Sequence, residues 1–139
     1  MKQFTIKLSL ILSFLGFLIA TYLTILHFRN IIPPCSIAHG CETVLTSQFA
    51  TIIGIPIALI GSLYYIALIV VLALTLTFTQ KKGLFKKATV LLTFSALIVS
   101  AILVGIQAFI LHAFCQWCLT CEAINLLLFI LALLQSRFE

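Results

Sequence analysis

The five cysteines of the sequence form two spaced pairs and one single residue. Cys115 and Cys118 make a Cys-x-x-Cys motif near the end of the chain, and five residues separate Cys35 from Cys41. Residues three apart share one face of a helix, so the two sulfurs of the motif can bond to each other. A helix N-terminus also lowers the pKa of a nearby thiol and favours the reactive thiolate. Two dithiols within reach of each other form a relay for thiol–disulfide exchange.

Two other uses of these cysteines stay open. The pairs can be static disulfides that hold a loop in place. They can also bind zinc, with ligands drawn from Cys35, His39, Cys41, Cys115, Cys118 and His112. A relay is favoured because zinc sites usually hold their ligands in tighter pairs on a preorganised ribbon. We therefore predict no metal.

The elements that position the cysteines are those of an integral membrane protein. Of the 139 residues, 63% are hydrophobic and 8% are charged, and the mean hydropathy is +1.31. A soluble domain carries roughly 25% charged residues, and a helix needs ~20 apolar residues to cross a bilayer. Nearly charge-free stretches predict spans at 8–28, 55–78, 88–112 and 115–134, an outer loop at 29–54 and a cytoplasmic loop at 79–87. The expected fold is a single all-α domain, a four-helix membrane bundle whose extracytoplasmic loop carries a cysteine pair.

Basic residues predict the orientation of this bundle. Arg29 alone lies on the side of the long loop. Seven basic residues lie on the side of the termini, namely Lys2, Lys7, Lys81, Lys82, Lys86, Lys87 and Arg137. Both termini are thus expected in the cytoplasm, and the net charge of +5 is a topology signal rather than a nucleic-acid-binding face. The two cysteine pairs then lie on the oxidising side of the membrane, where disulfides persist.

A polar stripe continues inward from the Cys-x-x-Cys motif. The 3-4-3 spacing of its members places them on one helix face: Cys115, Cys118, Glu122 and Asn125. An ionisable residue inside a membrane is a functional candidate by default. Glu122 is expected either to donate a hydrogen bond or a proton to a bound quinone, or to pair with His112 or Gln107. Cys121 lies off the stripe and is expected to be a small packing residue.

A relay needs an electron donor and an electron acceptor. Outward-facing cysteines suit a dithiol on an extracytoplasmic protein as the donor. Cys118 lies about 4.5 Å deeper in the membrane than Cys115, by the rise of a helix. The deeper thiol is better placed to meet a membrane-soluble oxidant, and a quinone, either menaquinone or ubiquinone, is the expected acceptor.

Taken together, these residues resemble the short bacterial form of the vitamin K epoxide reductase family. The matching segments are "CSIAHGC", "CETVLTSQFATIIGIPIALIGSLYY" and "FCQWC". The resemblance implies a four-helix bundle around a quinone pocket in the bacterial plasma membrane. It implies that a soluble thioredoxin-like thiol oxidase reduces the Cys35–Cys41 pair, that Cys41 exchanges with Cys115, and that Cys118 reacts with the quinone. Many bacterial relatives carry a fused thioredoxin-like domain; because this chain ends at Glu139, a separate partner is expected.

The resemblance also implies quinone-binding positions, which are Ser47, Ile57, Phe114 and Glu122. Many members have Asn in place of Ile57, and animal members have Tyr in place of Glu122. These replacements argue against vitamin K epoxide as the substrate and leave quinone reduction intact. The predicted function is therefore that of a quinone-linked, disulfide-forming oxidoreductase. The alternative is a non-enzymatic membrane protein that binds metal or assists assembly, with structural cysteines. An unrelated disulfide-generating membrane family is disfavoured because its Cys-x-x-Cys motif precedes its spaced pair.

Overall fold

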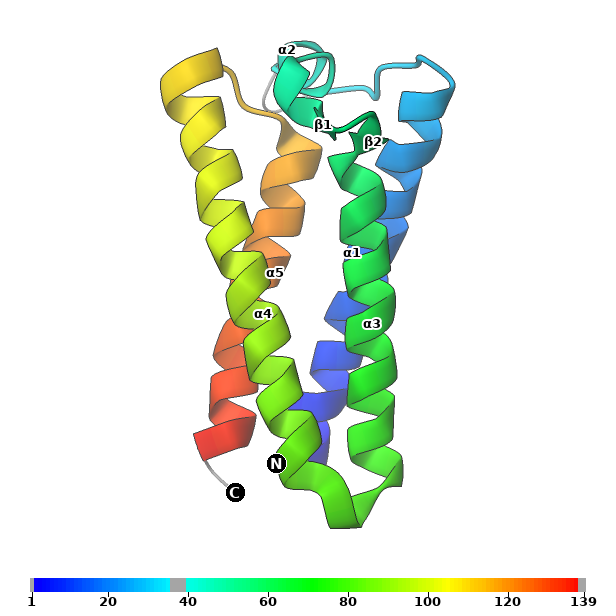
Figure 1. The fold of residues 1–139 in the computed structure, drawn as a ribbon, viewed down its shortest axis with the longest axis vertical. Helices are drawn as coiled ribbons and strands as arrows, with labels where there is room; N and C mark the ends of the chain where they lie inside the picture. Colours follow the sequence, from blue (N-terminus) through cyan, green and yellow to red (C-terminus); the bar gives the residue numbers. More distant parts are fainter. Residues whose placement is uncertain (1, 36–39, 138–139) are drawn as a thin grey trace.

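The chain folds as a bundle of long helices, seen in a computed structural model that describes residues 2–35 and 40–137. In this part of the chain, four helices are long and apolar enough to cross a membrane. Their bounds are α1 (Lys2–Phe28), α3 (Ile57–Thr77), α4 (Lys82–Gly105) and α5 (Gln116–Arg137). They run side by side, with both chain ends at the same end of the bundle (Figure 1). The all-α membrane fold predicted from the charge-free stretches is confirmed.

The helices extend beyond those charge-free stretches. α1 begins at Lys2, and α4 begins at Lys82, so most of the predicted 79–87 loop is helical. Only the short 3-10 turn η2 (Thr79–Lys81) and Phe78 connect α3 to α4. Hydropathy marks the part of a helix that crosses hydrocarbon, whereas its backbone hydrogen bonds continue into the headgroup region. The loop predicted from the sequence was therefore longer than the one in the structure.

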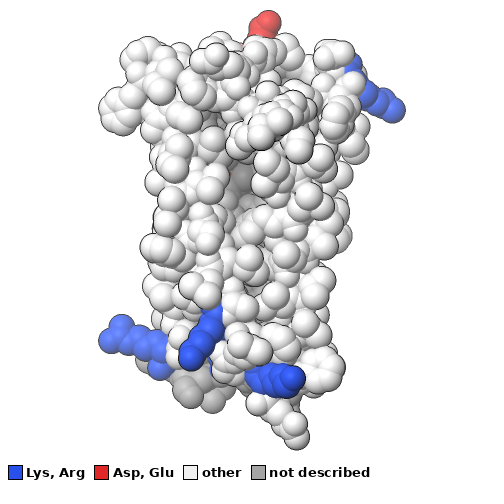
Figure 2. Space-filling model, in the orientation of Figure 1, with Lys and Arg blue, Asp and Glu red and all other residues white. Residues whose placement is uncertain are grey.

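Basic side chains gather at one end of the bundle. Figure 2 shows most Lys and Arg at the end that carries the termini and the α3–α4 connection. We call this the lysine end. The opposite end carries Arg29, which directly follows α1, and the segment from residue 40 to the start of α3. We call it the cysteine end because Cys35, Cys41, Cys115 and Cys118 all lie there.

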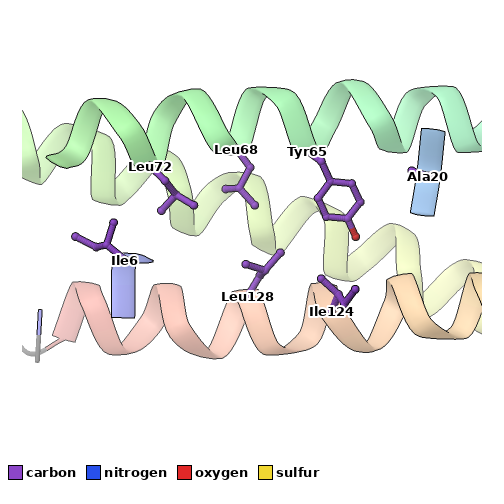
Figure 3. Close-up of a cluster of buried hydrophobic side chains, with 7 residues drawn as sticks. All are labelled: Ile6, Ala20, Tyr65, Leu68, Leu72, Ile124 and Leu128. Atoms are coloured by element: carbon purple, nitrogen blue, oxygen red, sulfur yellow. The ribbon is translucent and has the colours of Figure 1, made fainter. Parts of the chain in front are cut away.

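The buried core lies in the middle of the bundle and toward the lysine end. Its members come from α1, α3 and α5: Ile6, Ala20, Tyr65, Leu68, Leu72, Ile124 and Leu128. Figure 3 shows the α3 and α5 side chains of this cluster pointing toward one another. Many other large apolar side chains are exposed, such as Phe14 and Leu91 at 55% and 66%. A surface this apolar is unsuited to water and suits contact with lipid chains.

Small and hydroxyl-bearing residues allow the helices to pack closely. Gly16 on α1 faces the ring of Tyr65 so closely that a Cβ atom would overlap it. Hydroxyls inside the bundle bond back to the carbonyl four residues earlier, as Thr93 does to Thr89 at 2.8 Å. Such bonds satisfy polar groups where no water is available.

The segment before α3 lies across the cysteine end of the bundle (Figure 1). It contains α2 (Cys41–Leu45), η1 (Gln48–Ala50) and a two-stranded hairpin of β1 (Thr51–Ile52) and β2 (Ile55–Pro56). Ile53 and Gly54 join the strands with φ angles of 54° and 80°. Two positive φ angles are characteristic of a tight two-residue hairpin turn. Pro56 then leads directly into α3.

Candidate functional site

A cavity of about 710 Å³ lies in the cysteine half of the bundle. It is lined mostly by apolar side chains from α1, α3, α4, α5 and the segment between α2 and β1. Tyr65 belongs to both the cavity wall and the core, so the cavity ends where the tight packing begins. The face between α3 and α4 is hollowed in Figure 2. Cavities of this size and character bind small organic molecules.

The Cys-x-x-Cys motif lies where α5 meets the cavity. Cys115 is fully buried just before the helix, whereas Cys118 is partly exposed and lines the cavity. Both are free thiols, and the N–H of Cys118 donates to Sγ of Cys115 at 3.3 Å. The side chain of Cys118 and the N–H groups of Cys118 and Trp117 stabilise a Cys115 thiolate. These hydrogen bonds outweigh burial and lower the pKa of Cys115 from 9.0 to about 7.

Gln107 holds Cys115 in this position. α4 continues into a π-helical turn, η3 (Ile106–Leu111), in which Gln107 is only 3% exposed. Its Oε1 accepts the N–H of Cys115 at 3.0 Å, and its carbonyl accepts the N–H groups of His112 and Ala113. One residue therefore organises the whole turn from η3 to α5. Single π-helical turns often occur at functional sites.

The loop pair is bonded as a Cys35–Cys41 disulfide, with 6.2 Å between the two Cα atoms. Its two flanking residues, Pro34 and Gly40, are held against the motif. Gly40 donates its N–H to the carbonyl of Phe114 at 3.0 Å, and Trp117 Nε1 donates to the carbonyl of Pro34 at 3.0 Å. A Cβ at Gly40 would lie 2.6 Å from the N and O atoms of Phe114, so only glycine allows this approach. The structure thus brings the loop disulfide against the main chain that carries Cys115.

Three of the four predicted quinone-binding residues line the cavity. They are Ser47, Ile57 and Glu122. Phe114 is placed elsewhere: its side chain is 42% exposed and outside the cavity lining, and its main chain contacts Gly40. The expectation that Phe114 contacts a cavity ligand is therefore not supported by its position.

Cys121 lines the cavity as well, contrary to the expectation that it is a packing residue. At about 100° per residue it lies roughly 40° from Asn125 around the helix. The cavity is wider than the polar stripe, so it reaches this neighbouring position. The carbonyl of Cys121 also accepts the hydroxyl of Tyr65 at 3.3 Å.

Glu122 has one buried oxygen, Oε2, with no hydrogen-bond partner among the described residues. The two partners suggested from the sequence, Gln107 and His112, do not bond to Glu122. Gln107 binds the N–H of Cys115, and His112 is exposed with a left-handed backbone, φ 49°. The structure therefore records no hydrogen bond from Glu122 to either residue, although Glu122 itself lines the cavity.

The stripe residue Asn125 is held by the protein itself. Its Oδ1 accepts the Tyr65 hydroxyl at 2.9 Å, and its Nδ2 donates to Oγ of Ser100 at 2.9 Å. This network joins α3, α4 and α5 at the inner end of the cavity. Tyr64, the neighbour of Tyr65, also lines the cavity, and its buried hydroxyl has no partner in the described part of the chain.

Several of these residues were not predicted as part of a site. Tyr64 and Tyr65 look like ordinary aromatic residues of an apolar span, and Gly40 looks like a loop glycine. Gln107 offered a signal, because an amide in an apolar span eight residues before Cys115 needs a hydrogen-bond partner. Its actual partner depends on the π-helical turn, which no periodicity in the sequence indicates.

Among residues 2–35 and 40–137, no group of three or more His, Cys, Asp or Glu side chains is arranged to hold a metal ion. His39, the candidate zinc ligand of the loop, lies outside the described residues. The zinc alternative that includes His39 therefore stays a matter for chemical analysis.

Comparison with known proteins identifies the family. The sequence pattern of the Vitamin K epoxide reductase family matches residues 7–133, which is nearly the whole chain. No individual curated protein matches the sequence. Four membrane-crossing helices and the cysteines agree with the helical membrane bundle of that family, and its members are oxidoreductases. The chain is therefore a multi-pass membrane protein that belongs to the vitamin K epoxide reductase family.

Proposed function

We propose that this chain is a quinone-dependent thiol oxidoreductase that generates disulfides. It reoxidises a soluble extracytoplasmic thioredoxin-like protein and passes two electrons to a membrane quinone, either menaquinone or ubiquinone. The observation that carries the proposal is a continuous succession of groups. The loop disulfide lies against the main chain around Cys115, Cys115 contacts Cys118, and Cys118 lines an apolar cavity.

The steps follow from thiol–disulfide exchange. The dithiol of the partner reduces the Cys35–Cys41 disulfide and is itself oxidised. The Cys41 thiolate then attacks a Cys115–Cys118 disulfide at Cys115 and releases the Cys118 thiolate. Cys35 next attacks Cys41, which restores the loop disulfide and leaves Cys115 and Cys118 reduced.

The arrangement in the structure corresponds to the end of that sequence. Cys35 and Cys41 are bonded, and Cys115 and Cys118 are thiols. To complete the cycle, the two thiols form a disulfide and give up two electrons and two protons. A quinone accepts both the electrons and the protons, and Cys118 is the member of this pair that lines the cavity.

The residues around the cavity fit a quinone. The walls are mostly apolar, which suits the ring and its lipid tail, and Ser47, Ile57 and Glu122 lie in them. The unpartnered Oε2 of Glu122 is available to a ligand. In its neutral form, the Glu122 carboxyl can donate a hydrogen bond to a quinone oxygen and deliver a proton there. Because Oε2 has no partner among the described residues, it makes that contact without breaking a hydrogen bond seen in the structure.

We place the protein in the bacterial plasma membrane, with the lysine end in the cytoplasm. The gathering of Lys and Arg at that end supports this orientation. The cysteine end then faces the compartment in which disulfides persist and in which a thioredoxin-like partner works.

Cysteine substitution tests the order of exchange. In Cys118→Ala, Cys115 attacks the loop disulfide at Cys41 but lacks its own resolving thiol. Alkylation of the released Cys35 thiol prevents reversal, so a Cys41–Cys115 disulfide accumulates and is detected by non-reducing mass spectrometry. Cys121→Ala, which leaves Cys118 in place, is the matched control and traps no such bond. Detection of Cys35–Cys41 alone in Cys118→Ala counts against the proposed order.

The non-enzymatic alternative predicts a different composition of the purified protein. Stoichiometric zinc, together with the absence of disulfides in air, would overturn the relay and favour a metal-binding protein. The relay predicts a Cys35–Cys41 disulfide and no bound zinc.

A further inference from the structure

Tyr64 carries a buried hydroxyl that the cysteine relay does not use. The residue lies on α3 and lines the cavity together with Cys118 and Glu122. Its hydroxyl and Oε2 of Glu122 are both buried without a hydrogen-bond partner among the described residues. The third such atom in the described part of the chain, Oγ of Ser13, belongs to a residue that does not line the cavity.

The neighbouring residue, Tyr65, shows how this protein satisfies a buried tyrosine hydroxyl. Tyr65 is also buried, and its ring centroid lies 5.0 Å from that of Tyr64. Its hydroxyl donates to Asn125, so the protein satisfies it. A buried polar group left without a partner is costly and rare in folded proteins. Because Tyr64 lines a cavity large enough for a ligand, a group of that ligand can supply the missing partner.

We propose that the Tyr64 hydroxyl is a second hydrogen-bond contact to the quinone head group and that it selects ligands with two carbonyl oxygens. This inference rests on the proposed function. A quinone presents two carbonyl oxygens and no donor, so it is bound best by two donors that reach it from different directions. Among the cavity-lining residues that the structure describes, Tyr64 on α3 and neutral Glu122 on α5 have the unpartnered groups that can provide them.

Tyr64 and Glu122 also suit the quinol, which is the product of the reaction. When Cys115 and Cys118 form a disulfide, the quinone gains two electrons and two protons, and its carbonyl oxygens become hydroxyls. Those hydroxyls donate, and the oxygen atoms of Tyr64 and Glu122 accept. Ile57, which also lines the cavity, has no polar atom in its side chain to replace either contact.

Binding to the full-length protein in lipid nanodiscs tests the contact without relying on turnover. The probes are a 1,4-naphthoquinone and 1-tetralone, which keeps the fused rings but has one carbonyl oxygen. Quenching of Trp117, the single tryptophan and a direct neighbour of Cys118, reports binding. Tyr64→Phe removes one oxygen atom and keeps the ring. Tyr22→Phe removes a hydroxyl outside the cavity lining and keeps the ring that contacts Trp117.

We expect the wild-type protein and Tyr22→Phe to prefer the naphthoquinone over 1-tetralone by the same factor. In Tyr64→Phe that preference falls by about 5- to 10-fold, as the loss of one hydrogen bond predicts. An unchanged preference in Tyr64→Phe overturns the Tyr64 contact. Thiol oxidation by the quinone is measured in parallel. A protein that binds the quinone but transfers no electrons contradicts the proposed function, and a wild-type protein that does not bind it overturns both proposals.

Discussion

Replacement of Gln107 by leucine should disturb both the stability of the protein and the reactivity of Cys115. Gln107 is 3% exposed and supplies the acceptor for the N–H of Cys115. Leucine has a similar size but no acceptor, so the substitution leaves this N–H buried and unpaired. The main-chain bonds from His112 and Ala113 to the Gln107 carbonyl remain.

The magnitude follows from these contacts. A buried N–H without a partner costs about 1–3 kcal/mol, so we expect the free energy of unfolding to fall by about 2 kcal/mol. The pKa of Cys115 is lowered by the Cys118 side chain and by the N–H groups of Cys118 and Trp117. These donors point at Sγ only while Cys115 is held at the start of α5. Loosening that attachment should raise the pKa of Cys115 toward its ordinary value of 9.0.

The assay combines reversible unfolding in mixed micelles with alkylation of Cys115 over a range of pH, followed by mass spectrometry. Gln135→Leu is the matched control. Gln135 is also buried, and it donates to Oγ of Ser9 near the lysine end. Gln135→Leu should lower the free energy of unfolding without changing the pH at which Cys115 becomes reactive. The reasoning is refuted if Gln107→Leu leaves both the stability and the midpoint of Cys115 alkylation at their wild-type values.

One pH profile and three further substitutions test the site and the helix packing. In the wild-type protein, Cys115 should be alkylated as the thiolate with a midpoint at about pH 7, slowing at lower pH because the thiol is protonated. Cys118→Ala removes the largest cause of the lowered pKa and should move the midpoint toward 9.0; equal midpoints in the two proteins would contradict this cause. Gly40→Ala forces the loop away from Phe114. Exchange between Cys41 and Cys115 should therefore slow by about 10-fold or more, because the reacting sulfurs are misplaced, while Cys35–Cys41 still forms. The rate at which the Cys41–Cys115 disulfide forms, followed by rapid alkylation and mass spectrometry in a Cys118→Ala background, checks this. Gly83→Ala, where a Cβ meets open space, is the control, and an unchanged rate would show that the loop contact is unnecessary. Gly16→Ala overlaps the ring of Tyr65 and should lower the free energy of unfolding by about 1–3 kcal/mol. The same unfolding assay measures this change. A wild-type free energy of unfolding in Gly16→Ala would mean that α1 can move away from Tyr65 at no cost.

The spans and the location of the cysteine pairs could be predicted because both depend on strong, local signals. A nearly charge-free stretch of twenty residues has few alternatives to a membrane-crossing helix. Helix ends were less predictable, as the helical start of α4 at Lys82 shows. Backbone hydrogen bonding decides where a helix begins, and it continues past the point at which hydropathy changes.

The details of the site depended on contacts between distant segments, which the sequence does not display. Spacing placed Cys118 and Glu122 on one face of α5 but did not show how wide the cavity is, so it did not indicate that Cys121 also lines the cavity. Phe114 was assigned by resemblance to ligand binding, whereas its main chain holds Gly40. The unpartnered hydroxyl of Tyr64 is defined by what surrounds it in three dimensions. Only the packed bundle distinguishes it from the satisfied hydroxyl of Tyr65.

Anaerobic reaction of the reduced protein with a quinone tests the central claim most directly. The quinol formed is measured by absorbance, and the thiols of both cysteine pairs are counted by mass spectrometry after rapid alkylation. The account predicts one quinol for each disulfide formed in the two pairs together, because the loop thiols pass their electrons on through Cys115, and no quinol from Cys118→Ala. Quinol formation at the same rate in Cys118→Ala, or quinone that stays oxidised beside the reduced wild-type protein, would contradict it.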